Sequence, residues 1–169
     1  DLHAGQIQGF FDIPVDNLFA TPIFARHARK KIKSRKIVCV APDVGGTERA
    51  RALGKLLNVG LAIVDKRRPK PGQSQVMNVI GDVKGQTCII VDDIIDSGGT
   101  IVNAAKALKE KGAKEVFVYI THGVLSGDAV KKIKNSVIKN LVITDTIDNS
   151  EKIKNVKNIE VLPISGLIG

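Results

Sequence analysis

A run of apolar, mostly β-branched residues at 88–95 lies near the middle of the chain and encloses two carboxylates. Such a run predicts a strand that is buried in a sheet. Polar and glycine residues follow at 96–100, and apolar positions then recur with helical spacing from 101 to 108. Gly112 is placed to end that helix. The pattern therefore predicts a strand, a glycine-rich loop and a helix N-terminus in direct succession.

The same succession occurs once earlier in the chain. The largely apolar run 36–42 predicts a strand, which is followed by Asp43 and the pair Gly45 and Gly46. A helix is predicted after them, and its core-facing residues are Ala50, Leu53, Leu56 and Leu57. The spacing of the two loops fits two neighbouring strands whose carboxyl ends meet at one edge, where open α/β sheets bind ligands.

The remaining pattern predicts further strands and helices around these two units. Strands are predicted at 61–65, 115–123, 140–147 and 156–165, and an amphipathic helix within 20–35 whose His27 is partly exposed. Residues 76–85 predict a short hairpin-like segment, and Ser126 is expected to cap a helix that runs to about residue 133. The predicted fold class is α/β, with a mostly parallel central sheet flanked by helices.

The loop at 96–100 has the chemistry of a phosphate site. Its glycines allow backbone N–H groups to approach a phosphate, the helix N-terminus is partly positive, and Ser97 and Thr100 add hydroxyl donors. Asp92, Asp93 and Asp96 would repel a phosphate, but they suit the hydroxyls of a sugar or a hard cation. Together these groups indicate a phosphorylated sugar. The alternative is that Asp96 and Ser97 only cap the helix and the glycines only turn the chain.

A basic segment follows the predicted strand 61–65. Lys66, Arg67, Arg68 and Lys70 are accompanied by two prolines and a glycine, a composition typical of an exposed, mobile loop. A run of charges is usually a solvated face. Its place at a strand end beside the two glycine loops favours a role in the same site. Asp43 has a structural alternative as well, as an N-cap residue beside packing glycines.

Composition narrows the range of partners. The chain has 169 residues, 43% of them hydrophobic, which is enough for one domain with a full core. Its 26 basic and 17 acidic residues give a net charge of +9, but aromatic residues are only 4% and Trp is absent, so we expect no nucleic-acid partner and a charge suited to polyphosphate ligands. No membrane span or export signal is found, which predicts a cytoplasmic protein. Cys39 and Cys88 are expected to be buried free thiols.

Three stretches carry a family resemblance. VDDIIDSGGT at 91–100 resembles the ribose-phosphate loop that type I phosphoribosyltransferases share with ribose-phosphate pyrophosphokinases. APDVGGTERARA at 41–52 resembles the pyrophosphate-contacting loop of the second family, and DLHAGQIQGFFDIPVDNL at 1–18 resembles its signature, which phosphoribosyltransferases lack. The resemblance covers essentially the whole chain. It implies a type I phosphoribosyltransferase-like fold.

The resemblance also implies an activity and the residues that carry it. Ribose-phosphate pyrophosphokinases transfer the diphosphoryl group of Mg–ATP to the anomeric hydroxyl of ribose 5-phosphate, giving phosphoribosyl pyrophosphate (PRPP) and AMP. The implied catalytic residues are Lys66 and Arg68. The implied ribose 5-phosphate site comprises Arg68, Asp92, Asp93, Asp96, Ser97, Gly98, Gly99 and Thr100. The implied ATP and pyrophosphate site comprises His3, Asp43, Gly45 and Gly46, with His3 and Asp43 as the ligands of Mg²⁺.

Members of that family have two similar halves and assemble as hexamers of dimers. By this comparison, residues 1–18 would end the N-terminal half and residues 19–169 would form the C-terminal phosphoribosyltransferase-like domain. We therefore expect a chain truncated at both ends, able to bind ribose 5-phosphate but inactive alone, with no nucleic-acid or membrane partner.

Two other functions remain open from the sequence. One is a phosphoribosyltransferase that consumes PRPP together with a nitrogenous base, and the other is a non-catalytic module that binds PRPP or associates with the synthase. His122, at the end of the predicted strand 115–123, could line the site or be structural.

Overall fold

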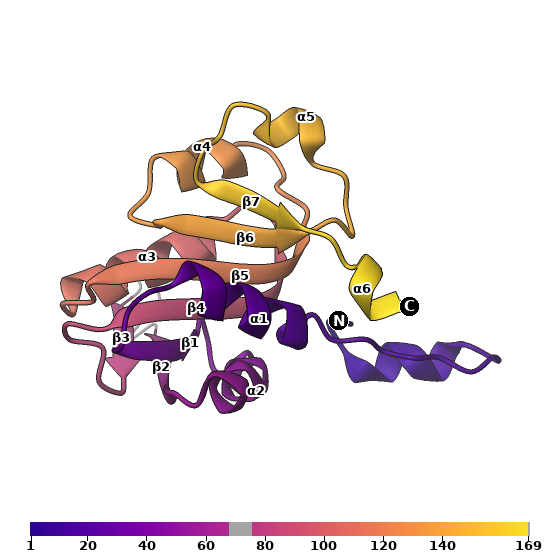
Figure 1. Ribbon diagram of the computed structural model, residues 1–169, viewed down its shortest axis with the longest axis horizontal. Coiled ribbons are helices and arrows are strands. Elements are labelled where there is room, and N and C mark those ends of the chain that lie inside the picture. The colour runs from indigo at the N-terminus through magenta and orange to yellow at the C-terminus, as the bar shows by residue number, and fades with distance from the viewer. Residues whose placement is uncertain (68–75, 169) are drawn as a thin grey trace.

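A seven-stranded sheet forms the centre of the molecule in the computed structural model, which describes residues 1–67 and 76–168 (Figure 1). Its order is β3-β2-β1-β4-β5-β6-β7, and all neighbouring strands are parallel except β2 and β3. The strands are β1 (Ile37–Ala41), β2 (Gly60–Arg67), β3 (Val76–Ile80), β4 (Thr87–Ile95), β5 (Glu115–Gly123), β6 (Asn140–Thr144) and β7 (Ile159–Leu162). The predicted α/β class with a mostly parallel sheet is confirmed.

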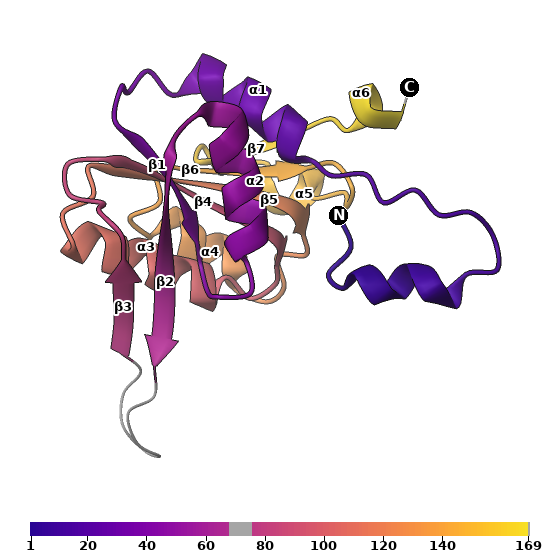
Figure 2. The same cartoon turned by 90° about the horizontal axis from the view of Figure 1, so that it is seen from below.

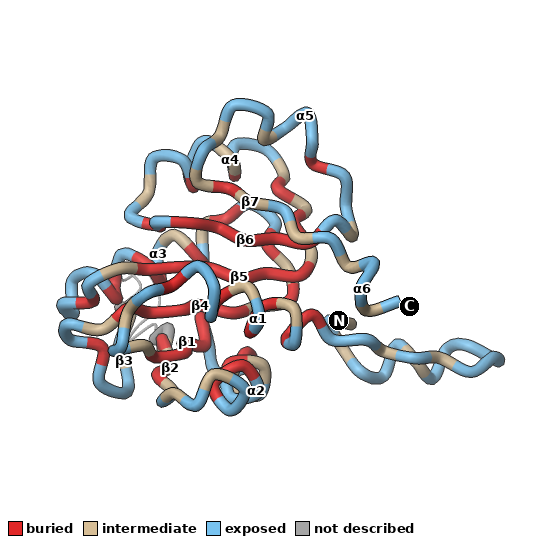
Figure 3. Tube along the Cα trace, viewed as in Figure 1, coloured by how far each residue is buried: buried red, intermediate tan, exposed pale blue. Residues whose placement is uncertain are grey.

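Helices cover both faces of this sheet. The helical elements are η1 (Gly5–Phe10), α1 (Thr21–Lys31), α2 (Thr47–Leu57), α3 (Gly99–Glu110), α4 (Ala129–Lys134), α5 (Ser150–Ile153) and α6 (Ser165–Ile168). Side chains of α1 and α2 form one apolar cluster with one face of the central strands, and side chains of α3 and α4 form a second cluster with the other face. The central strands are accordingly buried, whereas the outer helices and loops are mostly exposed (Figure 3).

The strand order changes direction between β1 and β4. The chain runs from β1 outward to β2 and β3, and then returns to β4 on the other side of β1. Val38 pairs with Cys88 and Val40 with Ile90, so the two strands that precede the glycine loops are parallel neighbours, as predicted. The crevice at such a switch point is where open α/β sheets bind ligands.

Several local predictions were wrong, and each error has a structural cause. Residues 76–85 form no hairpin of their own, because β3 pairs antiparallel with β2 and Gly81 then leads the chain toward β4. Lys66 and Arg67 continue β2 rather than starting a loop, since they pair with Met77 and Val76. The helix expected from Ser126 begins at Ala129, and Leu56 is 42% exposed because α2 packs through Ala50 and Leu53.

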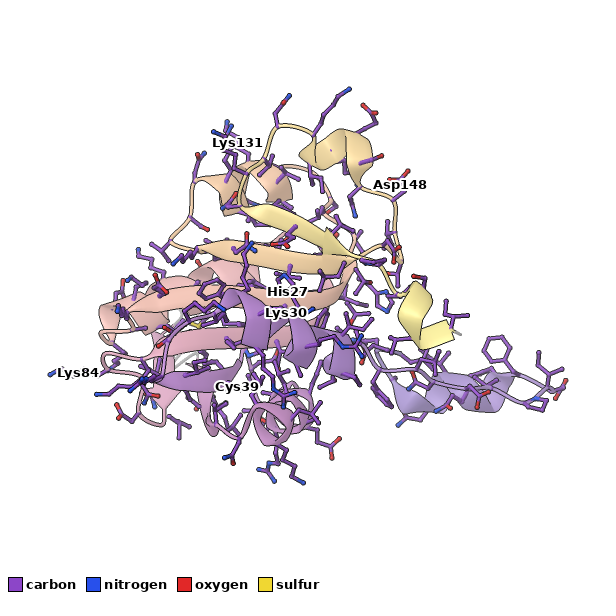
Figure 4. The ribbon with its side chains drawn as sticks, in the orientation of Figure 1. His27, Lys30, Cys39, Lys84, Lys131 and Asp148 are labelled. Carbon is purple, nitrogen blue, oxygen red and sulfur yellow. The ribbon has the colours of Figure 1, made fainter. Side chains whose placement is uncertain are left out.

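Other local predictions are confirmed. Cys39 and Cys88 are buried free thiols. His27 retains only 16% of its side-chain exposure, since it lies on α1 between the Tyr119 hydroxyl and the Glu160 carboxylate, each 3.0 Å away (Figure 4). This pair of hydrogen bonds fastens α1 to β5 and β7.

The N-terminal segment projects from the body of the molecule. Figures 1 and 2 show η1 in an arm beside the sheet rather than on it. No residue of η1 is buried, and Phe10 is 86% exposed. The first residues of the chain, by contrast, lie against the carboxyl ends of the strands, where Asp1 is bonded to Thr121 of β5 and His3 to Asp93 of β4.

Candidate active site

A cavity of about 590 Å³ opens at the carboxyl ends of β1 and β4. Every predicted site residue whose side chain the structure describes lines this cavity. The lining residues are His3, Asp43, Gly45, Gly46, Arg49, Asp92, Asp93, Ile94, Ile95, Asp96, Ser97, Gly98, Gly99, Thr100 and Ile101. The backbone of Lys66 lies in β2, and Arg68 lies outside the described residues. Residues separated by up to 98 positions in the sequence therefore converge on one cavity.

The loop after β4 is shaped by one glycine. Gly98 has φ +74°, in the left-handed region, and it is the N-cap residue of α3. A Cβ there would meet only ordinary contacts, the nearest 3.7 Å away on Ala129, so the backbone angle requires glycine and the available space does not. In the part of the chain that the structure describes, no side chain forms a capping hydrogen bond at this N-cap. The alternative that Asp96 and Ser97 merely cap α3 is thus not realised.

The loop after β1 is closed by its own acid. Asp43 accepts a hydrogen bond through Oδ1 from the Gly46 amide at 2.9 Å. A Cβ on Gly45 would come within 3.3 Å of that oxygen, and one on Gly46 within 3.2 Å of Pro42, so both positions are tight for any side chain. Asp43 thus shapes the loop before α2, and its carboxylate borders the cavity.

Arg49 links the acids of β4, and it was not among the predicted site residues. Its two terminal nitrogens lie 3.2 Å from Asp92 Oδ1 and 3.2 Å from Asp93 Oδ2. The same Asp93 oxygen is 2.9 Å from Nδ1 of His3. The sequence did contain a sign that Arg49 belongs to the site, because Arg49 stands in the first turn of the helix that follows the predicted phosphate loop. Neighbouring Arg51 could have been chosen equally well, and only the helix phase separates them.

The two adjacent acids of β4 differ in their electrostatics. Burial raises the pKa of Asp92 from its ordinary value of 3.8 to about 7. Burial works in the same direction on Asp93, but the hydrogen bond with His3 and the charge of Arg49 outweigh it and hold the pKa of Asp93 below its ordinary value. Near neutral pH the site therefore holds one firmly ionised carboxylate beside one that gains or loses a proton easily.

Asp92→Asn is expected to raise the melting temperature at pH 8 by a few degrees, a change of about 1 kcal/mol. The pKa of Asp92 is raised from 3.8 to about 7 in the folded protein. Between about pH 4 and pH 7 the folded protein therefore keeps the Asp92 proton, whereas the unfolded chain has already released it. Ionised Asp92 therefore costs stability above pH 7, and that cost disappears as the pH falls toward 4. Calorimetric melting of both proteins from pH 4 to pH 8 measures this. A lower melting temperature for the variant at pH 8 would show that pairing with Arg49 outweighs burial.

The side chains at the cavity can be compared with the ligands that a divalent cation requires. Within residues 1–67 and 76–168, no group of three or more His, Cys, Asp or Glu side chains is arranged to hold a metal. Mg²⁺ commonly takes only one or two protein carboxylates and completes its shell with water and substrate phosphates. Asp43, at the mouth of a phosphate-type loop, fits that pattern, and His3, whose Nδ1 is bonded to Asp93, would have to contribute through Nε2.

The fold is an α/β fold of the phosphoribosyltransferase type. An adenine phosphoribosyltransferase shares this fold, with a TM-score of 0.57 over 70% of this chain and 75% of its own, at 20% identity. The family model described as phosphoribosyl synthetase-associated domain matches residues 64–169. The chain belongs to this family.

Relatives with much higher identity cover the whole chain. The ribose-phosphate pyrophosphokinase of Bradyrhizobium diazoefficiens is 61% identical over 168 residues, which make up 99% of this chain and 53% of that protein. The one from Agrobacterium fabrum is 59% identical over 169 residues, all of this chain and 54% of that protein. The crystal structure of phosphoribosylpyrophosphate synthetase from Mycobacterium smegmatis has a TM-score of 0.89 at 39% identity and covers 99% of this chain and 54% of its own. The chain thus spans about half the length of the relatives that it matches.

No helix in the described ranges, 1–67 and 76–168, is long and apolar enough to cross a membrane.

Proposed function

We propose that this chain forms the sugar-phosphate half of a ribose-phosphate diphosphokinase. The whole enzyme would transfer the diphosphoryl group of Mg–ATP to the anomeric hydroxyl of ribose 5-phosphate, yielding PRPP and AMP. The observation that carries the proposal is the convergence of both glycine loops, His3 and the β4 acids on one cavity at the switch point. Identity of about 60% to ribose-phosphate pyrophosphokinases supports it.

The β4 side of the cavity suits ribose 5-phosphate. The amides at the N-terminus of α3, with the hydroxyls of Ser97 and Thr100, offer donors to the 5-phosphate. Asp92 and Asp93 lie on the β4 side of the same cavity, where their oxygens can accept hydrogen bonds from the ribose hydroxyls. Arg49 balances their charge before the sugar arrives. Asp96, exposed at the start of the loop, lines the same cavity and is assigned to the same ligand.

The β1 side suits the diphosphoryl donor. We assign His3, Asp43, Gly45 and Gly46 to the triphosphate, and His3 and Asp43 to the Mg²⁺ that accompanies it. Bound Mg²⁺ would neutralise charge on the phosphate oxygens. The loop amides and the carboxylate of Asp43 would orient the donor against the sugar. In-line transfer needs mainly positioning and charge stabilisation, so no covalent intermediate on the protein is required.

Lys66 and Arg68 remain the proposed catalytic cations. β2 is parallel to β1, so its carboxyl end, which carries Lys66, lies at the same sheet edge as the two glycine loops. Cations there would stabilise charge on the transferring group. Arg68 lies outside the described residues, and its role is proposed from the family resemblance alone.

The proposal extends to the remainder of the protein. We propose that residues 1–18 belong to an N-terminal half of similar fold and residues 19–169 to the C-terminal half. We further propose that the enzyme assembles as a cytoplasmic hexamer of dimers. Because the relatives are nearly twice as long, the 169 residues alone are proposed to bind ribose 5-phosphate but to turn over poorly.

Titration calorimetry of this chain with ribose 5-phosphate, and separately with Mg–ATP, tests the assignment. We expect ribose 5-phosphate to bind and Mg–ATP to bind weakly, and Asp96→Ala to lower ribose 5-phosphate affinity at least tenfold through loss of hydrogen bonds to a charged acceptor. Asp148→Ala is the matched control, because Asp148 is exposed at the rim of the molecule, away from the cavity (Figure 4). Tight Mg–ATP binding without ribose 5-phosphate binding would contradict the proposal.

A further inference from the structure

The first residue of the chain is bound to the carboxyl end of β5, next to the cavity. The Asp1 side chain is only 2% exposed, and its Oδ2 accepts hydrogen bonds from the Thr121 hydroxyl at 2.6 Å and from the Ala20 amide at 3.0 Å. Its other oxygen, Oδ1, is buried without a hydrogen-bond partner among the described residues and lies 3.9 Å from Nε of Arg49. One carboxylate therefore joins β5, the start of α1 and the arginine that binds the β4 acids.

His122 holds the same residue through its backbone. Its Nε2 lies 2.7 Å from the Asp1 carbonyl oxygen, which can only accept, so Nε2 carries the proton and donates. Its Nδ1 lies 2.9 Å from the Thr146 hydroxyl, which then donates to it. Burial lowers the pKa of His122, in keeping with this neutral form. His122 does not line the cavity and points toward the chain start instead.

The contacts of Asp1 with Thr121 and His122, called the anchor below, position the His3 imidazole. The His3 side chain is 76% exposed, and among the described residues its hydrogen-bond partner is Asp93, at 2.9 Å. Packing contributes little to the position of such an exposed ring, so its place depends on where the backbone two residues earlier is fixed. The following segment cannot supply that constraint, because η1 has no buried residue.

We propose that Thr121 and His122 are positioning residues for His3. They hold Asp1 at the sheet edge, so that the His3 ring stays on Asp93 at the mouth of the cavity. Loosening the anchor should weaken binding on the diphosphoryl-donor side of the site and spare the ribose 5-phosphate side. This consequence rests on the proposed function.

The chain has three histidines, so imidazole NMR of this protein follows His3 directly. Asp93→Asn defines the His3 ring signal when its carboxylate partner is lost. We expect His122→Leu to move the His3 signal at least halfway to that reference position. His122→Gln keeps an N–H donor at similar reach and should leave the signal at its wild-type place. Thr121→Val breaks the second contact independently, and covers the case in which His122→Leu fails to fold. A His3 signal at the wild-type position in folded His122→Leu or Thr121→Val would overturn the inference.

Kinetics separates this inference from the function on which it rests. In an enzyme that carries this sequence at the full length of its relatives, we expect His122→Leu to raise KM for Mg–ATP about tenfold, the size of one lost charge-assisted contact. KM for ribose 5-phosphate should change less than twofold, and His122→Leu should add nothing in a His3→Ala background. Equal effects on both substrates, or full additivity with His3→Ala, would refute positioning through His3. An unchanged KM for Mg–ATP in His3→Ala itself would contradict the proposed function instead.

Discussion

Lys66→Ala is expected to lower turnover by at least 10²-fold, the usual cost of removing one group that stabilises transition-state charge. The measurement is steady-state PRPP formation by an enzyme that carries this sequence at the full length of its relatives. Phosphoryl-type transfer places negative charge on equatorial oxygens, and a fixed cation contributes most at that moment. The effect should therefore fall on kcat more than on either KM. Lys66→Arg should retain part of the activity, because the charge is kept.

The same variant should melt within about 2 °C of the wild type, because the backbone at Lys66 lies near the end of β2, at the periphery of the sheet. At Lys66, β2 has passed the end of its pairing with β1, which stops at Ile63, and its remaining partner among the described strands is the edge strand β3. Figure 2 shows these two strands extending together beyond the rest of the sheet. Lys84→Ala is the matched control, since Lys84 is exposed just before β4, at the amino ends of the strands and far from the cavity at their carboxyl ends (Figure 4). Near-normal turnover of Lys66→Ala would remove Lys66 from the catalytic residues.

The two glycine loops could be predicted from sequence because each is a local pattern. An apolar run, an acid, two glycines and a helical repeat occupy fewer than 25 residues, and every signal in them acts between near neighbours. The adjacency of β1 and β4 was predictable too, because both loops follow parallel strand ends. What the pattern could not show was that β2 continues through Lys66 and Arg67. That extension depends on pairing with β3, and charge composition alone favours a loop there.

The Arg49 and Asp1 contacts could not be predicted for a different reason. Arg49 binds Asp92 across 43 positions, and Asp1 binds Thr121 across 120. Contacts of this span depend on the completed sheet order and on the phase of α2, neither of which is encoded in a short motif. The sequence placed His3 in the site by family resemblance, but the anchor that holds His3 there is visible only in three dimensions.

Gly98→Ala is expected to lower affinity for both ribose 5-phosphate and inorganic phosphate at least tenfold, because each hydrogen bond to a charged phosphate is worth about 1.5–3 kcal/mol. Alanine at φ +74° is strained, and the loop can relieve that strain by rotating the amides at the start of α3 away from the phosphate position. The nearest contact of the new methyl group, 3.7 Å from Ala129, is an ordinary one, so steric overlap does not cause the loss. Calorimetry with both ligands measures it.

Gly85→Ala is the control that separates strain from site geometry. Gly85 has φ +70°, almost the angle of Gly98, and a Cβ there would meet nothing within 4 Å. It lies just before β4, at the amino ends of the strands, whereas the cavity lies at their carboxyl ends. Both variants should lose about 1 kcal/mol of stability from the strained backbone, a few degrees in melting temperature. Only Gly98→Ala should lose phosphate binding. If both variants kept wild-type affinity, the amides at the N-terminus of α3 would not be the phosphate donors, and the ribose 5-phosphate would have to bind elsewhere in the cavity.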